Sequence, residues 1–219
     1  MSIVDNLQII SSSLPKHVSL VAVSKTKPIS DIQEAYDAGQ RIFGENKIQE
    51  MVEKHEVLPK DIEWHMIGHL QRNKVKYMAP FVDLIHGIDS LKTLKEINKQ
   101  ALKHHRNINC LLQVKIAQEE TKFGLETNEI ESILSNSAFN ELKNITITGL
   151  MGMASFIDDS SQVSKEFQSL KIIFDKLKTH HSSLTTISMG MSGDYKLAIE
   201  AGSNMIRVGS SIFGERNYL

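Results

Sequence analysis

A lysine follows a short apolar run near the start of the sequence, at a position where its amine could act as a nucleophile. Residues 20–23 are aliphatic and predict a buried strand, and Pro28 prevents that strand from continuing. Lys25 therefore lies at a strand end, with its stem in apolar surroundings. Partial burial disfavours the ammonium form and leaves an amine that can attack an aldehyde. The alternative is a surface lysine whose stem covers apolar neighbours, and this segment alone leaves both open.

Two groups of small residues late in the sequence have the composition of an anion-binding site. Ser192 and Gly193 precede the expected start of a helix, where a hydroxyl and unpaired backbone N–H groups converge. Gly209 and Ser210 form a second small turn, in which the backbone can approach an anion closely. Each turn alone could be an ordinary serine-capped turn. Together they favour a phosphate site.

An arginine interrupts the apolar run at residues 205–208. Arg207 keeps its charge, so its burial in a strand requires a partner. That partner could be a carboxylate such as Glu45 or Glu215, or a ring nitrogen or anion of a bound ligand. Lys25, the phosphate turns and Arg207 together suit pyridoxal 5′-phosphate. The lysine would take the aldehyde, the turns the phosphate, and Arg207 the pyridine nitrogen.

The elements that must position these residues alternate along the whole chain. Short β-rich or apolar runs occur at residues 19–24, 41–43, 63–67, 84–88, 109–116, 145–151, 185–189 and 205–208, with helical periodicity between them. Such alternation requires a parallel sheet, because each helix must return the chain. Eight units predict an α/β fold, a single (β/α)₈ TIM barrel over residues 1–219, with the active site at the strands' carboxyl ends. An open flavodoxin-like sheet is the alternative.

Helix signals add detail to this barrel. Residues 4–10 predict an extra N-terminal helix ahead of the first strand. Ser30 with Gln33, and Asn46 with Gln49, have the form of capping boxes and predict two helix starts.

Composition excludes several classes of function. The 219 residues carry a net charge of −1, so no strong field recruits nucleic acid or an anionic membrane. We expect a cytoplasmic protein, because the sequence shows neither a signal peptide nor an apolar run of membrane-spanning length. The one cysteine, Cys110, lies in an apolar run and predicts a buried, inert thiol. His65 and His69 flank a predicted strand rather than share a helix face, so we expect no metal site.

Seven segments resemble the pyridoxal phosphate homeostasis protein family. They are AVSKTKP at 22–28, FGENKIQE at 43–50, WHMIGHLQRNK at 64–74, KFGL at 122–125, GLM at 149–151, SMGMSGD at 188–194 and RVGSSIFG at 207–214. The resemblance covers nearly the whole chain. It implies a barrel like the N-terminal domain of alanine racemase, with Lys25 holding pyridoxal 5′-phosphate as an internal aldimine. It also implies that Ser192, Gly209 and Ser210 hold the phosphate, that Arg207 faces the pyridine nitrogen, and that Asn46 lies near the cofactor.

The resemblance implies a protein that binds and buffers the cofactor, or delivers it to apo-enzymes, without robust catalysis. Chemistry agrees, because arginine only donates hydrogen bonds and leaves the pyridine nitrogen opposite it unprotonated, a poorer electron sink. Racemases of this fold take a second base, a tyrosine, from a further β domain, for which we expect no room after Leu219. We therefore expect a monomer. A small amino-acid racemase, and a barrel binding another phosphorylated metabolite, are the alternatives.

Overall fold

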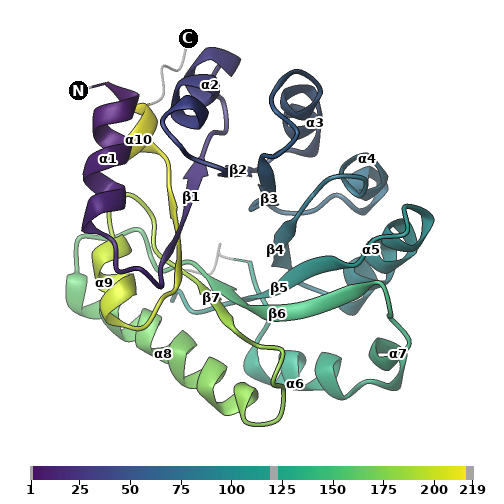
Figure 1. Cartoon of the computed structure of the whole chain (residues 1–219). Helices are drawn as coiled ribbons and strands as arrows, with labels where there is room; N and C mark the ends of the chain where they lie inside the picture. The colour runs from purple at the N-terminus through teal and green to yellow at the C-terminus, as the bar shows by residue number, and fades with distance from the viewer. Residues whose placement is uncertain (1, 119–122, 216–219) are drawn as a thin grey trace.

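The computed structural model describes residues 2–118 and 123–215 and shows a closed barrel of parallel strands (Figure 1). Each strand pairs with its neighbours in the chain, and the last pairs with the first. The strands are β1 (Ser19–Val23), β2 (Ile42–Glu45), β3 (Glu63–Met66), β4 (Leu84–Ile88), β5 (Ile108–Val114), β6 (Ile145–Gly152), β7 (Thr186–Ser188) and β8 (Met205–Val208). The predicted (β/α)₈ barrel is confirmed, and the open sheet is wrong.

Helices surround the barrel and explain why its strands are apolar on both faces. They are α1 (Ile3–Ser13), α2 (Ile29–Asp37), α3 (Ile48–Val57), α4 (Val75–Met78), α5 (Leu91–Lys103), α6 (Thr127–Ser135), α7 (Ser137–Asn140), α8 (Ser160–Lys178), α9 (Tyr195–Glu200) and α10 (Ser210–Phe213). A short 3₁₀ turn, η1 (Arg72–Lys74), precedes α4. The extra helix α1 lies beside α10, so the two ends of the described chain meet (Figure 1).

The core has two parts, one on each side of the barrel wall. The larger part lies between strands and helices and includes Phe43, Trp64 and Phe167, all buried. A smaller cluster of Leu84, Leu111 and Met151 fills the barrel. Because side chains alternate along a strand, polar residues in register with the smaller cluster also point into the barrel.

The two predicted capping boxes are wrong. Helix α2 begins at Ile29 after Pro28, whose extended backbone ends the preceding segment, so Ser30 already lies inside the helix. Helix α3 begins at Ile48, because Lys47 is still extended, and Asn46 lies outside its cap. Capping boxes are present instead at Ser2, before α1, and at Glu126, before α6.

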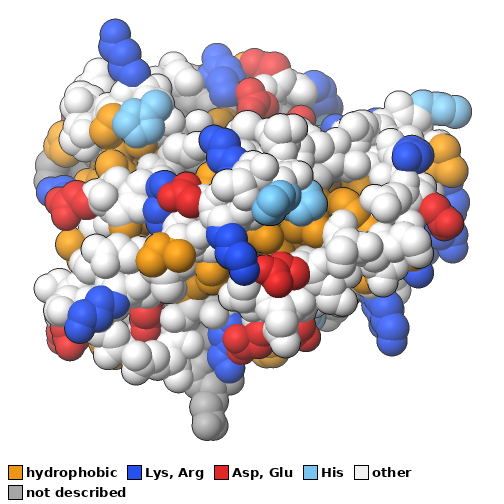
Figure 2. Space-filling view, turned by 90° about the horizontal axis from the view of Figure 1, so that it is seen from below, with side chains coloured by type: hydrophobic (Ala, Val, Ile, Leu, Met, Phe, Trp, Pro, Cys, Tyr) orange, Lys and Arg blue, Asp and Glu red, His pale blue; other side chains and the backbone are white. Residues whose placement is uncertain are grey.

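The surface carries mixed charge. Figure 2 shows Lys and Arg side chains interspersed with Asp and Glu around a central gathering of hydrophobic side chains on one face. None of the helices in the described part of the chain has the length and apolarity needed to cross a bilayer. Cys110 is buried, as predicted, and burial raises the pKa of its thiol.

Candidate functional site

Pairing between the first and last strands brings the predicted site residues to one end of the barrel. Val21 of β1 lies opposite Arg207 of β8, and Ala22 lies opposite Val208. Gly209 follows directly, so close to β1 that an added Cβ would lie 3.2 Å from the carbonyl oxygen of Val23. Lys25 is half-buried just beyond β1. The register therefore places Lys25, Arg207 and Gly209 at the carboxyl ends of two adjacent strands.

The turns after β7 and β8 meet through a serine hydroxyl. The Oγ of Ser192 accepts hydrogen bonds from the backbone N–H groups of Gly209 (3.2 Å) and Ser211 (3.3 Å). Ser210 is the first residue of α10 and is exposed, whereas Gly193 has open space around it. The two turns that the sequence analysis singled out therefore lie side by side. The N–H groups of Gly209 and Ser211 are bonded to Ser192 Oγ, which keeps its own hydroxyl proton as a donor for an anion such as phosphate.

The Arg207 guanidinium is buried in the barrel and held by two acceptors. It donates to Ser188 Oγ at 2.6 Å and to the carbonyl oxygen of Gly152 at 3.0 Å. The suggested pairing with Glu45 is wrong, because Glu45 lies on the other side of the barrel wall and pairs with Lys54. Glu215 is not the partner either, because among the described residues the hydrogen bonds of the guanidinium go to the Ser188 hydroxyl and the Gly152 carbonyl.

A chain of hydrogen bonds continues from Arg207 across the barrel. Ser188 Oγ lies 3.0 Å from His86 Nδ1, and His86 Nε2 lies 3.1 Å from His65 Nδ1. Arginine can only donate, so Ser188 Oγ accepts from Arg207, and it can still either donate its own proton to His86 or accept a second hydrogen bond from it. A neutral His86 donates through one ring nitrogen and accepts through the other. The two histidine bonds therefore run in the same direction along the chain, either from Ser188 to His65 or from His65 to Ser188.

Burial keeps these histidines neutral. It lowers the pKa of His65 to about 3, and it lowers the pKa of His86 well below the usual range, with the charge of Arg207 acting in the same direction. Burial also lowers the pKa of Arg207, to about 10, against the opposing carboxylate of Asp194. At neutral pH the chain therefore has one positive charge, on Arg207, at the end nearest the candidate phosphate turns.

Asn46 follows β2 at the same end of the barrel. Its side-chain Oδ1 is buried and has no hydrogen-bond partner among the described residues. A buried acceptor of this kind is costly unless a ligand supplies a donor. Together, the amine of Lys25, the converging donors around Ser192, the held guanidinium and the unpaired amide fit pyridoxal 5′-phosphate.

His65 and His69, which are four residues apart in the sequence, have different surroundings. His65 lies inside the barrel, bonded to His86, whereas the side chain of His69 is 61% exposed and lies beside Asp89. Within residues 2–118 and 123–215, no group of three or more potential metal ligands comes together.

Sequence reasoning missed His86, Ser188 and the partners of Glu45. A signal was available for His86 and Ser188, because both are polar residues in strands predicted to be buried, where an unpaired polar group is costly. The two partners of His86, which are His65 and Ser188, lie 21 and 102 residues away in the sequence, so the sequence alone did not reveal the contacts.

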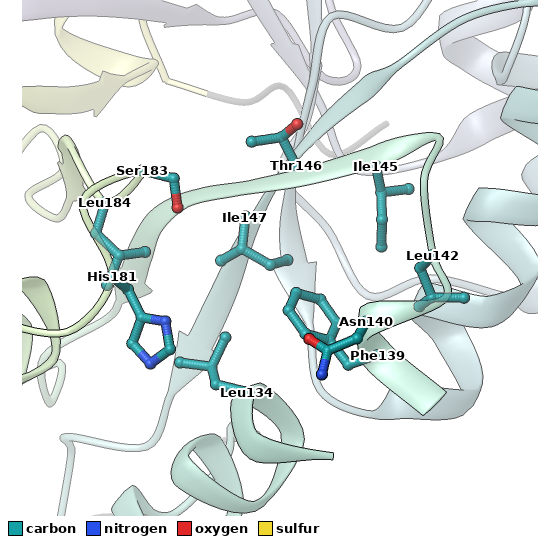
Figure 3. Close-up of a pocket in the computed structure, with 10 residues that line it drawn as sticks. All are labelled: Leu134, Phe139, Asn140, Leu142, Ile145, Thr146, Ile147, His181, Ser183 and Leu184. Carbon is teal, nitrogen blue, oxygen red and sulfur yellow. The ribbon is translucent and has the colours of Figure 1, made fainter. Parts of the chain in front are cut away.

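A separate pocket lies at the opposite end of the strands (Figure 3). It has a volume of about 250 Å³ and opens beside Ile145 and Ile147 at the start of β6. Leu134 and Phe139, from α6 and α7, line its apolar side, and His181 lies at its edge. It shares no residue with the candidate site.

Comparison with known proteins agrees with this geometry. The model of the alanine racemase N-terminal domain family matches residues 1–217. A protein of Vibrio alginolyticus named pyridoxal phosphate homeostasis protein is 41% identical over 209 residues, covering 93% of this chain and 89% of the relative. The protein of that name from Escherichia coli (strain K12) is 39% identical over 211 residues, covering 93% of this chain and 88% of the relative.

Solved structures extend the comparison. PipY of Synechococcus elongatus PCC7942, solved with pyridoxal phosphate bound, has a TM-score of 0.89 and 34% identity, covering 97% of this chain and 100% of PipY. An alanine racemase of Clostridium difficile 630 has a TM-score of 0.80 at 16% identity, covering 98% of this chain and 56% of the racemase. The racemase likeness concerns the fold alone.

Proposed function

The chain belongs to the pyridoxal phosphate homeostasis protein family, and from that premise we propose that it binds pyridoxal 5′-phosphate with Lys25 as an internal aldimine. The observation that carries the proposal is the β1–β8 register, which brings Lys25, Arg207 and Gly209 to one end of the barrel. The amine nitrogen of Lys25 would bond to the aldehyde carbon, and one water would leave. Ser192, Gly209 and Ser210 would hold the phosphate, and Asn46 would lie beside the cofactor.

The hydrogen-bond chain behind Arg207 supports a binding role rather than catalysis. Ser188 and Gly152 each accept one of the five N–H donors of Arg207, so the guanidinium is held in place with donors left for a ligand. A pyridine nitrogen opposite a fixed donor accepts and stays unprotonated, which weakens the ring as an electron sink. We therefore propose that the protein is not an enzyme, but keeps free pyridoxal phosphate low and available to apo-enzymes in the cytoplasm, as a monomer over one domain, 1–219.

The racemase alternative needs a second acid/base opposite Lys25. Tyr36 donates its hydroxyl proton to Asp61 on the outside of the barrel, and Tyr77 is exposed on α4. Tyr195 begins α9 and packs against the core. Tyr218 lies outside the described residues. The tyrosines that the structure describes therefore give the racemase reading no support.

Reduction with borohydride tests the site directly. Purified protein is incubated with pyridoxal 5′-phosphate, reduced, and mapped by peptide mass spectrometry. We expect a yellow protein labelled at Lys25, a Lys25→Ala variant that is unlabelled, and a Lys76→Ala control on the exposed face of α4 that is labelled normally. Label spread over exposed lysines, or none, contradicts the proposal and favours a barrel for another phosphorylated metabolite.

Carrier and catalyst are separated by two further assays. We expect the loaded protein to activate an apo-aminotransferase faster than an ordinary holo-aminotransferase can donate its cofactor. If the loaded protein activates the apo-enzyme no faster than the holo-aminotransferase does, a carrier role is contradicted. Turnover of alanine or serine enantiomers that is lost in Lys25→Ala would establish the racemase instead.

A further inference from the structure

A buried ammonium lies between helix α3 and the carboxyl ends of β1 and β2, next to the backbone of Lys25. Lys54 of α3 is buried, and its Nζ donates to the carbonyl oxygen of Ser24 (2.8 Å), to Glu45 Oε1 (2.7 Å) and to Glu50 Oε1 (2.7 Å). A lysine ammonium has three N–H donors, so all three are used. One of them holds the peptide group that joins Ser24 to Lys25.

Glu50 holds the peptide group on the other side of Lys25. The Oε1 atom that pairs with Lys54 also accepts the backbone N–H of Thr26. Ser24 is fixed a second time, because its Oγ donates to Glu45 Oε1 at 2.6 Å. The residues before and after Lys25 are thus both bonded to one three-residue ionic cluster, Lys54–Glu45–Glu50.

The backbone beside Lys25 needs such support. Thr26 has φ of +64°, in the left-handed region that a β-branched residue disfavours. Conformations of this kind persist only where the surroundings impose them, and they gather at functional sites. Two hydrogen bonds hold this turn: the backbone bond from Lys27 N–H to the Ser24 carbonyl oxygen (3.0 Å), and the bond from Thr26 N–H to Glu50.

Stability alone does not explain the cluster. Burying charges is costly, and a buried ion pair is often no more stabilising than apolar residues of similar volume. Here the cost is visible, because the second carboxylate oxygen of Glu45 is buried without a partner among the described residues, and burial raises the pKa of Glu45 to about 7. What the charges supply, and apolar residues could not, is bonds to the two peptide groups flanking Lys25.

We propose that Lys54, Glu45 and Glu50 are positioning residues for Lys25, which fix its backbone so that its amine meets the aldehyde of the cofactor in one orientation. The inference rests on the proposed function of Lys25. Small misplacements of a reacting group cost rates of about 10²-fold, so a cluster that fixes the backbone acts on the rate of attachment. Lys27 fixes the far side of the same segment, since its Nζ donates to the carbonyl oxygens of Phe213 and Gly214 at the end of α10.

Glu50 is the residue to change, because it is partly exposed and its loss leaves Lys54 paired with Glu45. Glu50→Ala removes the acceptor for Thr26 N–H. Glu50→Gln keeps an acceptor oxygen at the same place, and Glu53→Ala is a matched control on the exposed face of α3. All variants are compared by thermal melting first. Two measurements follow: hydrogen exchange of the Thr26 amide without cofactor, and the rate of borohydride-trapped labelling at Lys25 with pyridoxal 5′-phosphate.

In Glu50→Ala we expect exchange at Thr26 to rise at least about 10-fold and labelling at Lys25 to slow by about 10-fold or more, from the cost of misplacement. Glu50→Gln should restore most of both, and Glu53→Ala should match wild type. Unchanged exchange overturns the inference, as does faster exchange with unchanged labelling. If wild-type protein is not labelled at Lys25, the proposed function is refuted instead. The exchange measurement is made without cofactor, so it still reports whether Glu50 fixes the backbone at Thr26.

Discussion

The buried histidine pair makes the stability of the barrel depend on pH. His65 has a pKa near 6.5 in an unfolded chain and about 3 in the folded protein, because burial excludes the charged form. Between these values the unfolded state binds a proton that the folded state does not. The contribution of His65 to the free energy of unfolding is therefore fully present above about pH 6.5. It is lost as the pH falls below that value, by about 1.4 kcal/mol per pH unit.

The magnitude over an accessible range follows from the same two pKa values. From about pH 7.5 to about pH 5, the His65 contribution falls by about 2 kcal/mol. His65→Asn tests it, because an asparagine amide in the place of His65 Nδ1 can either accept from His86 Nε2 or donate to it. The variant cannot be protonated, so it should lose about 2 kcal/mol less than wild type over this range.

Urea unfolding followed by circular dichroism, at intervals across this pH range, measures the free energy of unfolding of each protein. His180→Asn is the matched control, because His180 is exposed after α8 and should leave the wild-type slope unchanged. Equal pH slopes for His65→Asn and wild type would refute the reasoning. That result would mean that burial does not lower the pKa of His65 in the folded protein.

Two further predictions concern the phosphate turn after β8 and the helix α10 that follows it. Gly209→Ala should weaken pyridoxal 5′-phosphate binding several-fold in an absorbance titration, because the added Cβ would lie 3.2 Å from the Val23 carbonyl oxygen and push β1 and the turn apart. Gly193→Ala is the control and should bind normally, because its added Cβ would meet no atom within 4 Å. Equal affinities of the two variants would contradict the close packing of this turn. Lys27→Met should lower the melting temperature, by about 2–4 °C for each kcal/mol of stability lost, because the carbonyl oxygens of Phe213 and Gly214 lose their donor. The same loss should raise the rate of hydrogen exchange at the Gly214 amide. An unchanged melting temperature and an unchanged exchange rate would contradict this role of Lys27.

Much of the architecture was predictable from local patterns. The apolar runs at residues 84–88 and 205–208 became β4 and β8 with the predicted bounds, and the periodic segment between the predicted strands at 145–151 and 185–189 became the long helix α8. These features are local, because periodicity and turn chemistry depend on neighbours in the sequence. Lys25, Ser192 and Gly209 could be nominated in the same way, since each follows a predicted strand. Helix starts were less predictable, as Asn46 shows, because a cap depends on where the preceding strand releases the chain.

What the sequence determined by itself is the order of elements, the closed barrel that eight such units imply, and the residues at its strand ends. Tertiary structure decided which of those residues have partners. Arg207 is held by Ser188 rather than by a carboxylate, His86 joins that serine to His65, and Lys54 reaches across to the peptide before Lys25. The reason is physical: these contacts depend on the register between strands far apart in the chain and on which side of the barrel wall each side chain points. No local pattern carries either quantity.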